Sequence, residues 1–181
     1  GLKDAGIIES DPAAYLKLGQ IEMVDQMVGV DYLKAQPFVD PERIGIFGWS
    51  YGGYMSLMCL AQAPDVFKVV VAGAPTSHYD GYDTHYTERY LGHPDENGAG
   101  YDATSVFPHL DGLSGKLLVI HGMADDNVLF TNSTRLFAEL QDRAIPFEMM
   151  TYPGKKHSIT GKATRTHLFE TVTRFFDRCL K

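Results

Sequence analysis

Apolar positions along the chain follow two patterns, short continuous runs and longer stretches with helical spacing. The continuous runs predict strands at residues 44–49, 69–74, 117–120 and 147–152. The helical stretches cover residues 20–36, 51–63, 132–143 and 161–181. In the first helix, the apolar stripe consists of Ile21, Val24, Met27, Val28, Tyr32 and Leu33. In the last helix, the expected inward side chains are Leu168, Val172, Phe175 and Phe176.

Strands separated by crossover helices predict a parallel sheet with helices on both faces, which is an α/β fold. Residues 76–115 are predicted to be irregular, apart from one short helix at 87–91. Catalytic groups in such folds lie at the carboxyl ends of the strands. The residues that directly follow the predicted strands are therefore the candidates for chemistry.

The composition fits one globular domain, because 181 residues with 44% hydrophobic and 22% charged side chains can bury a core. The net charge of −7 and the lack of a Lys/Arg cluster argue against a nucleic-acid partner. No apolar stretch is long enough to predict a membrane span. Cys59 and Cys179 lack metal-ligand spacing, so we expect two free, mostly buried thiols.

A candidate nucleophile lies in Gly48-Trp49-Ser50-Tyr51-Gly52, between a predicted strand and a predicted helix. This G-x-S-x-G pattern places the serine on a sharp turn that lifts its hydroxyl above the sheet. Because strand and helix approach closely, we expect glycine to be required two positions before and after the serine, with Gly53 extending the close approach. The Tyr51 N–H begins the helix and is placed to donate to an oxyanion.

A serine nucleophile needs a base, and the base needs a carboxylate that fixes its tautomer. In α/β-hydrolases the acid follows the serine and precedes the histidine. Asp125 and Asp126 both follow the strand at 117–120, and the pattern alone does not choose between them. His157 follows the strand at 147–152, and no other histidine lies in that position. Ser50, one of the two aspartates and His157 therefore form the candidate triad.

Several segments of the chain match one family in the same order. They are the serine motif with its continuation Gly53-Tyr54, the segment Tyr86-Thr87-Glu88-Arg89-Tyr90, the loop His121–Val128 and His157. From about residue 20 to its end, the chain resembles the catalytic part of prolyl oligopeptidase family serine peptidases that are dipeptidyl-peptidase IV-like. The resemblance implies an α/β-hydrolase fold and a peptide substrate. It also implies release of dipeptides after a penultimate Pro or Ala through an acyl-enzyme, with no metal or cofactor.

The resemblance also assigns roles to single residues. It makes Asp125 the triad acid and Asn127 a donor to the substrate carbonyl before the proline. The implied lining of the pocket for the residue before the cut is Tyr51, Tyr82, Tyr86 and Val128, and Tyr79 stands where the family often has a tryptophan. An aromatic-walled slot suits the flat, rigid proline ring. Ordinary aromatic packing is the alternative interpretation of these tyrosines.

Some parts that the resemblance implies do not occur in this chain. The family fold has further strands, which should precede residues 20–36 and pair with the open edge of the strand at 44–49. An upstream tyrosine, the second oxyanion donor, and an N-terminal β-propeller that grips the substrate's amino terminus are also absent. We therefore expect residues 1–19 to be a linker or irregular upstream segment. Residues 20–181 are expected to be the C-terminal part of an α/β-hydrolase catalytic domain.

The expected partners are the peptide substrate and the propeller and upstream strands of a longer protein. Relatives are often periplasmic, secreted or membrane-anchored, and many dimerise, so a homodimer is also an implication of the resemblance. Two other functions stay open, namely an acylaminoacyl-peptidase or esterase of the same fold, and a non-catalytic fragment or interaction module. Loss of one oxyanion donor typically costs about 10²–10³ in rate, so the fragment alone is expected to be weakly active or inactive.

Overall fold

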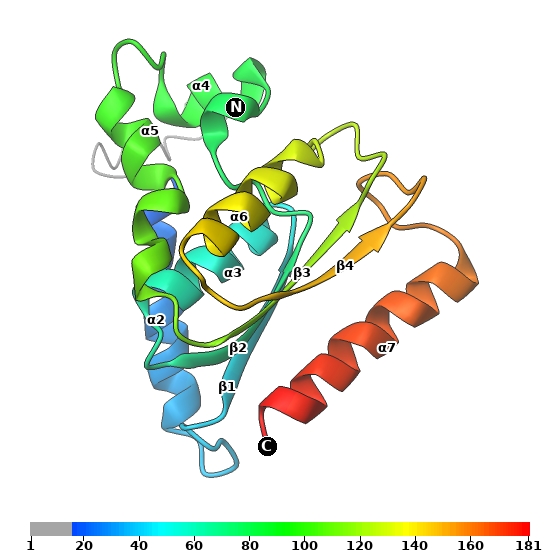
Figure 1. Ribbon diagram of the computed structural model, residues 1–181. Coiled ribbons are helices and arrows are strands. Elements are labelled where there is room, and N and C mark those ends of the chain that lie inside the picture. Colours follow the sequence, from blue (N-terminus) through cyan, green and yellow to red (C-terminus); the bar gives the residue numbers. More distant parts are fainter. Residues whose placement is uncertain (1–15) are drawn as a thin grey trace.

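The described part of the chain, residues 16–181 of a computed structural model, is built around one parallel sheet with helices on both sides (Figure 1). The strands are β1 (Ile44–Trp49), β2 (Phe67–Gly73), β3 (Lys116–Gly122) and β4 (Glu148–Tyr152). The helices are α2 (Gln20–Lys34), α3 (Tyr51–Gln62), α4 (Thr84–Leu91), α5 (Gly98–Thr104), α6 (Thr131–Asp142) and α7 (Lys162–Cys179). Most of the upstream segment expected at 1–19 lies outside the described residues.

The four strands pair in chain order, β1-β2-β3-β4, and every pair is parallel. In the register, Trp49 at the end of β1 lies beside Gly73, and Gly73 lies beside Ile120 of β3. Gly122 at the end of β3 lies beside Tyr152 at the end of β4. The carboxyl ends of all four strands therefore meet at one edge, where the serine motif and the two following loops begin. The α/β fold expected from the sequence is confirmed.

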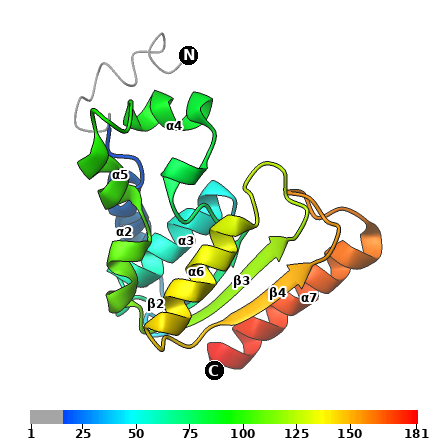
Figure 2. The same ribbon diagram turned by 45° about the horizontal axis from the view of Figure 1, so that its top comes forward.

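The two faces of the sheet bury different helices, as Figures 1 and 2 show. Val70 and Ala72 of β2 join a core with α2, α3, α5 and α6, whereas Val69 and Val71 join a second core with α7. This division follows from the period of two along a strand, which sends successive side chains to opposite faces. Residues 69–73 of β2 are therefore all apolar and all buried, because both faces of the strand are covered.

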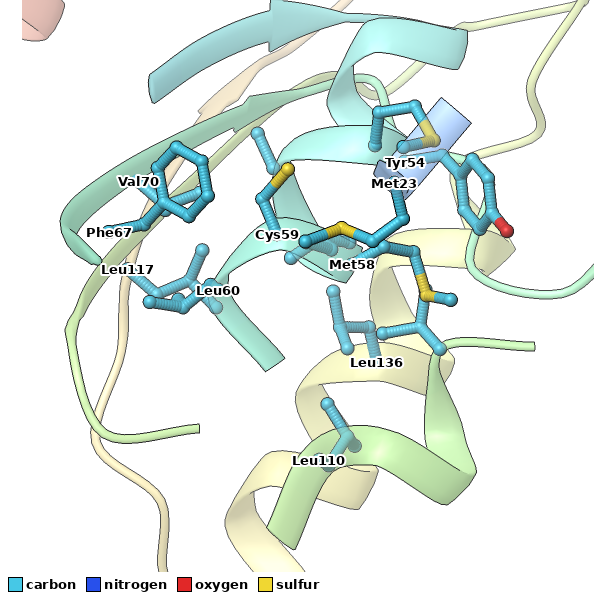
Figure 3. Packing of buried hydrophobic residues seen from close by; sticks show 14 of the residues in the cluster. Met23, Tyr54, Met58, Cys59, Leu60, Phe67, Val70, Leu110, Leu117 and Leu136 are labelled. Carbon is cyan, nitrogen blue, oxygen red and sulfur yellow. The ribbon is translucent and has the colours of Figure 1, made fainter. Parts of the chain in front are cut away.

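Helix α3 is the centre of the larger core. All residues from Gly53 to Ala61 are buried, which explains why this helix is apolar on every side. Figure 3 shows Met58, Cys59 and Leu60 among side chains from the sheet and from other helices. Cys59 is a free buried thiol and Cys179 is a free, half-buried one. Within residues 16–181, no helix has the length and apolar character needed to cross a membrane.

The inward face that the sequence predicted for α2 is only partly correct. Met23 and Val30 are the buried side chains of this helix, and Met27 packs against them. The other apolar side chains of the stripe are largely exposed, namely Val24, Val28, Tyr32 and Leu33. They face outward because α2 packs mainly against α3, at the outer side of the molecule. An apolar stripe predicts that a helix has a face to cover, but it does not say which neighbour covers it.

The expectation of an irregular segment at 76–115 is also only partly correct. The short helix near its middle is present as α4, and a further helix, α5, follows it. The sequence Gly98-Ala99-Gly100 has low helix propensity, which explains the omission. Tertiary contacts compensate, because the Thr104 hydroxyl donates to the Leu18 carbonyl and the Asn97 side chain donates to the Leu91 carbonyl.

Candidate active site

Ser50 lies on the sharp turn between β1 and α3. Its backbone has φ 61° and ψ −118°, a conformation that non-glycine residues rarely adopt and that typically costs about 1–3 kcal/mol. Two backbone hydrogen bonds hold the turn, from Ser50 N–H to the Gly73 carbonyl at 2.8 Å and from Tyr54 N–H to the Ser50 carbonyl at 3.0 Å. The Tyr51 N–H is the first of α3 and has no acceptor within the helix.

Two of the three glycines around Ser50 are needed for the steric reason expected from the sequence, and the third is not. A Cβ on Gly48 would come within 2.1 Å of the Gly52 carbonyl oxygen, so a side chain is excluded there. A Cβ on Gly53 would come within 2.3 Å of the Gly73 carbonyl oxygen. A Cβ on Gly52 itself would meet no described atom within 4 Å, so the expected collision at that position is wrong. Close packing of α3 on the sheet thus depends on Gly48 and Gly53.

The three side chains of the candidate triad form one hydrogen-bonded chain. Ser50 Oγ is 2.9 Å from His157 Nε2, and His157 Nδ1 is 2.8 Å from Asp125 Oδ2. Because the carboxylate accepts at Nδ1, the proton of the neutral imidazole resides there and Nε2 can accept from the serine hydroxyl. The Asp125 side chain is fully buried and that of His157 is 19% exposed. This arrangement can remove a proton from Ser50 and stabilise the resulting imidazolium.

The two adjacent aspartates have contrasting surroundings. Asp125 Oδ1 accepts hydrogen bonds from the N–H groups of Asn127 and Val128, at 2.9 and 3.0 Å. The side chain of Asp126 is 61% exposed and pairs with Lys156 across the gap between the two loops. The hydrogen bond from Lys156 lowers the pKa of Asp126. Of the two carboxylates, only that of Asp125 reaches His157.

The loops that carry the acid and the base are tied to each other and to the serine turn. The N–H of Ala124 donates to the Lys155 carbonyl at 3.0 Å, and a Cβ on Gly122 would come within 2.4 Å of that oxygen. Trp49, directly before the serine, donates from Nε1 to the His157 carbonyl at 3.0 Å. Trp49 therefore anchors the base loop, a role that the serine motif alone does not indicate.

The tyrosines expected in the substrate pocket form a continuous aromatic wall. Tyr79 stacks on Tyr86 with ring centroids 6.3 Å apart, and Tyr82 meets Tyr86 edge to face at 5.4 Å. The Tyr82 hydroxyl donates to Asn127 Oδ1 at 2.7 Å, which links the wall to the acid loop. Burial raises the pKa of Tyr82, and it raises the pKa of Tyr86 to about 12, so both phenols are protonated at neutral pH.

The expected pocket residues are not equally accessible. Tyr51, Tyr82 and Tyr86 are half-buried, whereas Tyr79 and Val128 are buried, at 1% and 0% exposed. Tyr79 lies between Tyr54 and the outer tyrosines, with ring centroids 5.2 Å from Tyr54. It supports the wall from behind. The backbone of Val128 contributes to the acid loop through its N–H and carbonyl groups.

Sequence reasoning missed one residue of this region, Glu22 on α2. Its carboxylate accepts from the Tyr51 hydroxyl at 2.6 Å and from the Gly19 N–H at 2.8 Å. Burial and the hydrogen bond to Glu22 raise the pKa of Tyr51, so its phenol remains a donor. The spacing Gly19-x-x-Glu22 is that of a capping box, in which Glu22 caps the start of its own helix. This spacing is the only local feature of the sequence that singles out Glu22. The link to Tyr51 spans 29 positions and appears only in the fold.

Comparisons with known proteins show that the chain is similar to dipeptidyl peptidases. Mouse dipeptidyl peptidase 8 (Mus musculus) is 46% identical over 147 residues, which is 79% of this chain and 16% of that protein. The protein named inactive dipeptidyl peptidase 10, also from Mus musculus, is 37% identical over 91% of this chain and 21% of its own length. The crystal structure of Porphyromonas gingivalis dipeptidyl peptidase 4 matches with a TM-score of 0.88 and 40% identity.

These matches cover only part of each relative. The match to the P. gingivalis structure includes 92% of this chain but 24% of that protein. At this level of identity the likeness extends from the fold to the family. Residues 11–181 match the prolyl oligopeptidase family itself. The chain belongs to the prolyl oligopeptidase family of peptidases.

Proposed function

We propose that this chain carries the catalytic triad of a serine peptidase that releases dipeptides after a penultimate Pro or Ala. The observation that carries the proposal is the hydrogen-bonded chain from Ser50 through His157 to Asp125, with links of 2.9 and 2.8 Å. Ser50 attacks the carbonyl carbon before the scissile bond while His157 takes its proton. Asp125 stabilises the imidazolium, which then protonates the leaving amine. Water, activated by His157, releases the acyl group from Ser50.

The oxyanion of each tetrahedral intermediate would receive a hydrogen bond from the Tyr51 N–H. The position of this group at the first turn of α3 supports the assignment, because the helix start also carries a partial positive charge. A second donor would come from upstream of this chain in the longer protein. Asn127 would orient the substrate by donating from its side-chain nitrogen, while its oxygen accepts from Tyr82.

The proposed preference for proline rests on Tyr51 and on Tyr82 and Tyr86, the outer members of the aromatic wall. Tyr51, Tyr82 and Tyr86 are half-buried and flank the serine and the acid loop, so they offer flat apolar faces to a small rigid ring. A long or charged side chain would lose hydration there without gaining a partner. Because this inference depends on packing alone, substrate preference is the property that the experiment must measure directly.

The test is hydrolysis of a Gly-Pro chromogenic anilide, compared with a short acyl ester, by the natural full-length protein. We expect anilide cleavage that is lost in the Ser50→Ala variant, by at least about 10⁴-fold. Cleavage of the ester alone would replace the peptidase proposal with an esterase. The relative named inactive makes the control essential, because membership of the family does not by itself establish activity. No Ser50-dependent turnover of either substrate would support a non-catalytic module.

We also propose that upstream strands of a longer protein cover the outer side of β1 and α2. Within the described residues β1 pairs only with β2, and its Phe47 side chain is 40% exposed. The exposed apolar stripe of α2 includes Val24 and Val28, at 63% and 64% exposed. Hydrogen exchange at the β1 amides tests this, since we expect slow exchange in the full-length protein and faster exchange in the isolated chain. Equal exchange in the two proteins would contradict the proposal.

A further inference from the structure

A second histidine contacts the acid of the triad at the same carboxylate oxygen as His157. His121 is the penultimate residue of β3, and its side chain is completely buried, as is that of Asp125. Its Nε2 lies 3.0 Å from Asp125 Oδ2 and 2.9 Å from the Val128 carbonyl oxygen. On the other side of the ring, Nδ1 lies 2.7 Å from the hydroxyl of Ser133, a buried residue of α6. The triad reaction itself does not use His121.

The partners of His121 fix its protonation. Nε2 faces a carboxylate and a carbonyl, both of which only accept, so Nε2 carries a proton. Burial lowers the pKa of His121, which favours the neutral ring with a bare Nδ1. The Ser133 hydroxyl then donates to Nδ1. Phe130 packs edge to face on the ring at a centroid distance of 5.4 Å and leaves little freedom to turn.

We infer that His121, held by Ser133, is a positioning residue that orients the Asp125 carboxylate toward His157. The inference rests on the proposed function, because it concerns the acid of the same triad. Its effect on catalysis passes through Asp125 and His157, without contact with the reacting atoms. It extends the hydrogen-bonded chain to Ser50–His157–Asp125–His121–Ser133.

The physical need for such a residue follows from the burial of the Asp125 charge. The ion-pair partners of Asp125 among the described residues are two histidines, and no Lys or Arg pairs with it. A buried carboxylate without a cation depends on hydrogen bonds to replace its lost hydration. Asp125 has two at Oδ1, from backbone N–H groups, and two at Oδ2, from the imidazoles of His157 and His121.

The two donors at Oδ2 also define the plane of the carboxylate. Rotation about the Cβ–Cγ bond would move both oxygens, breaking the backbone hydrogen bonds at Oδ1 and carrying Oδ2 away from His157. The His121 Nε2–H opposes that rotation, since turning the carboxylate would break a charge-assisted hydrogen bond in a site without room for a replacement. The imidazole of His157 is therefore presented with Nδ1 toward the acid and Nε2 toward Ser50.

The test compares two substitutions of His121 in the natural full-length protein. His121→Leu removes both ring nitrogens, whereas His121→Gln can place an amide N–H where Nε2 was. We expect His121→Leu to lower kcat by roughly 10- to 100-fold, the value of one hydrogen bond to a charged group, with little change in KM. We expect His121→Gln to restore most of the lost kcat. A merely structural role of His121 would not lower kcat at nearly constant KM, and glutamine would not restore the lost kcat.

A milder pair keeps the test decisive if His121→Leu does not fold. Ser133→Ala removes the hydroxyl that fixes the His121 ring, and Thr104→Val removes an equally buried hydroxyl on α5, which donates to the Leu18 and Gly100 carbonyls. Both variants should lose some thermal stability, but only Ser133→Ala should lower kcat, by about threefold or more. Equal kcat values for the two variants would overturn the inference.

Three further outcomes bear on this inference, and the first two separate it from the proposed function. If the unmodified protein shows no Ser50-dependent turnover, the proposed function fails and the inference fails with it. If turnover depends on Ser50 but folded His121→Leu retains wild-type kcat, the triad stands and His121 has no positioning role. A His121→Gln variant as slow as folded His121→Leu would likewise overturn the role of Nε2–H as a donor.

Discussion

Two regions meet at the carboxyl edge of the sheet, and they are held in different ways. The three side chains Ser50, His157 and Asp125 are joined by directional hydrogen bonds of 2.9 and 2.8 Å that end at the buried Asp125 carboxylate. The wall of Tyr79, Tyr82 and Tyr86 consists of rings whose centroids lie 5.4–6.3 Å apart. A hydrogen bond weakens steeply when its geometry changes, whereas ring contacts tolerate small shifts.

The difference separates the chemistry from the recognition of substrate. A proton can move between Ser50 and His157 only if three side chains stay aligned, so their supports must be rigid and buried. The wall has only to offer an apolar face of the correct width, and its outer members Tyr82 and Tyr86 are half-exposed. Changes in the first region should therefore lower kcat. Changes in the second should raise KM or alter the preference for the residue before the cut.

The strongest way to test this division is to exchange the carboxylate of each adjacent aspartate for an amide. Asp125→Asn should lower kcat by about 10⁴-fold, because the amide can stabilise the wrong tautomer of His157. Asp126→Asn is the matched control and should leave kcat within about twofold, because the Asp126 side chain is exposed and its ion pair with Lys156 lies at the surface. Steady-state kinetics of both variants, with thermal unfolding as a check on folding, make the measurement.

Comparable kcat losses in both aspartate variants would contradict the assignment of Asp125. This case also marks a limit of sequence reasoning. The strands could be predicted to within a few residues from apolar runs, and the order of serine, acid and histidine followed from the loops after them. The choice between adjacent aspartates could not be made from the pattern, because it depends on which side chain turns inward. Only the family resemblance indicated Asp125.

A substitution of Glu22 tests whether Tyr51, the expected pocket residue next to Ser50, needs support from another helix. Glu22→Ala leaves the half-buried Tyr51 hydroxyl and the Gly19 N–H without their acceptor. We expect kcat/KM for a Gly-Pro anilide to fall about tenfold, since an unpaired buried donor typically costs about 1–3 kcal/mol. The control is Asp25→Ala, an exposed acidic residue of the same helix. Equal values for the two variants would show that Tyr51 needs no anchor.

Glu22 also explains why the pocket was harder to predict than the triad. The triad residues each follow a strand, so topology alone brings them to one edge. Glu22 lies on α2, away from any strand end, and reaches Tyr51 only because α2 packs against α3. Tyr79 presents the opposite case, since its sequence position suggested a pocket residue but its side chain is 1% exposed. Helix packing decides both the contact of Glu22 with Tyr51 and the burial of Tyr79. The apolar pattern of the sequence does not determine how the helices pack.

Removing one hydroxyl from the wall should have a smaller effect. Tyr82→Phe loses the hydrogen bond to Asn127, so the amide can turn away from the substrate carbonyl. We expect KM to rise about three- to tenfold with kcat nearly unchanged. Tyr86→Phe is the matched control, because no hydrogen bond of its hydroxyl occurs among the described residues. Both phenols have raised pKa values, so the difference should not vary between pH 6 and 9.

The smallest effect is expected at Lys156, although it directly precedes His157 of the candidate triad. Its ion pair with Asp126 joins the same two loops as the hydrogen bond between His157 and Asp125, but the two charged side chains are 68% and 61% exposed. Water and salt screen such a pair, and holding two long side chains together costs entropy. Lys156→Met should therefore change kcat by less than about twofold, and the residual difference should disappear at 1 M salt.

A substitution of Trp49 provides the comparison for the Lys156 variant, because Trp49 holds the same loop through a partly buried hydrogen bond. Trp49→Phe removes the partly buried hydrogen bond to the His157 carbonyl, which salt does not screen. We expect a loss of about threefold or more in kcat that persists at 1 M salt. A larger loss in Lys156→Met than in Trp49→Phe would contradict the view that buried directional contacts, and not surface charge, align the base loop. The two substitutions remove contacts to the same loop, one partly buried and one exposed. The relative size of the two losses in kcat therefore tests whether burial decides how strongly a contact aligns the loop.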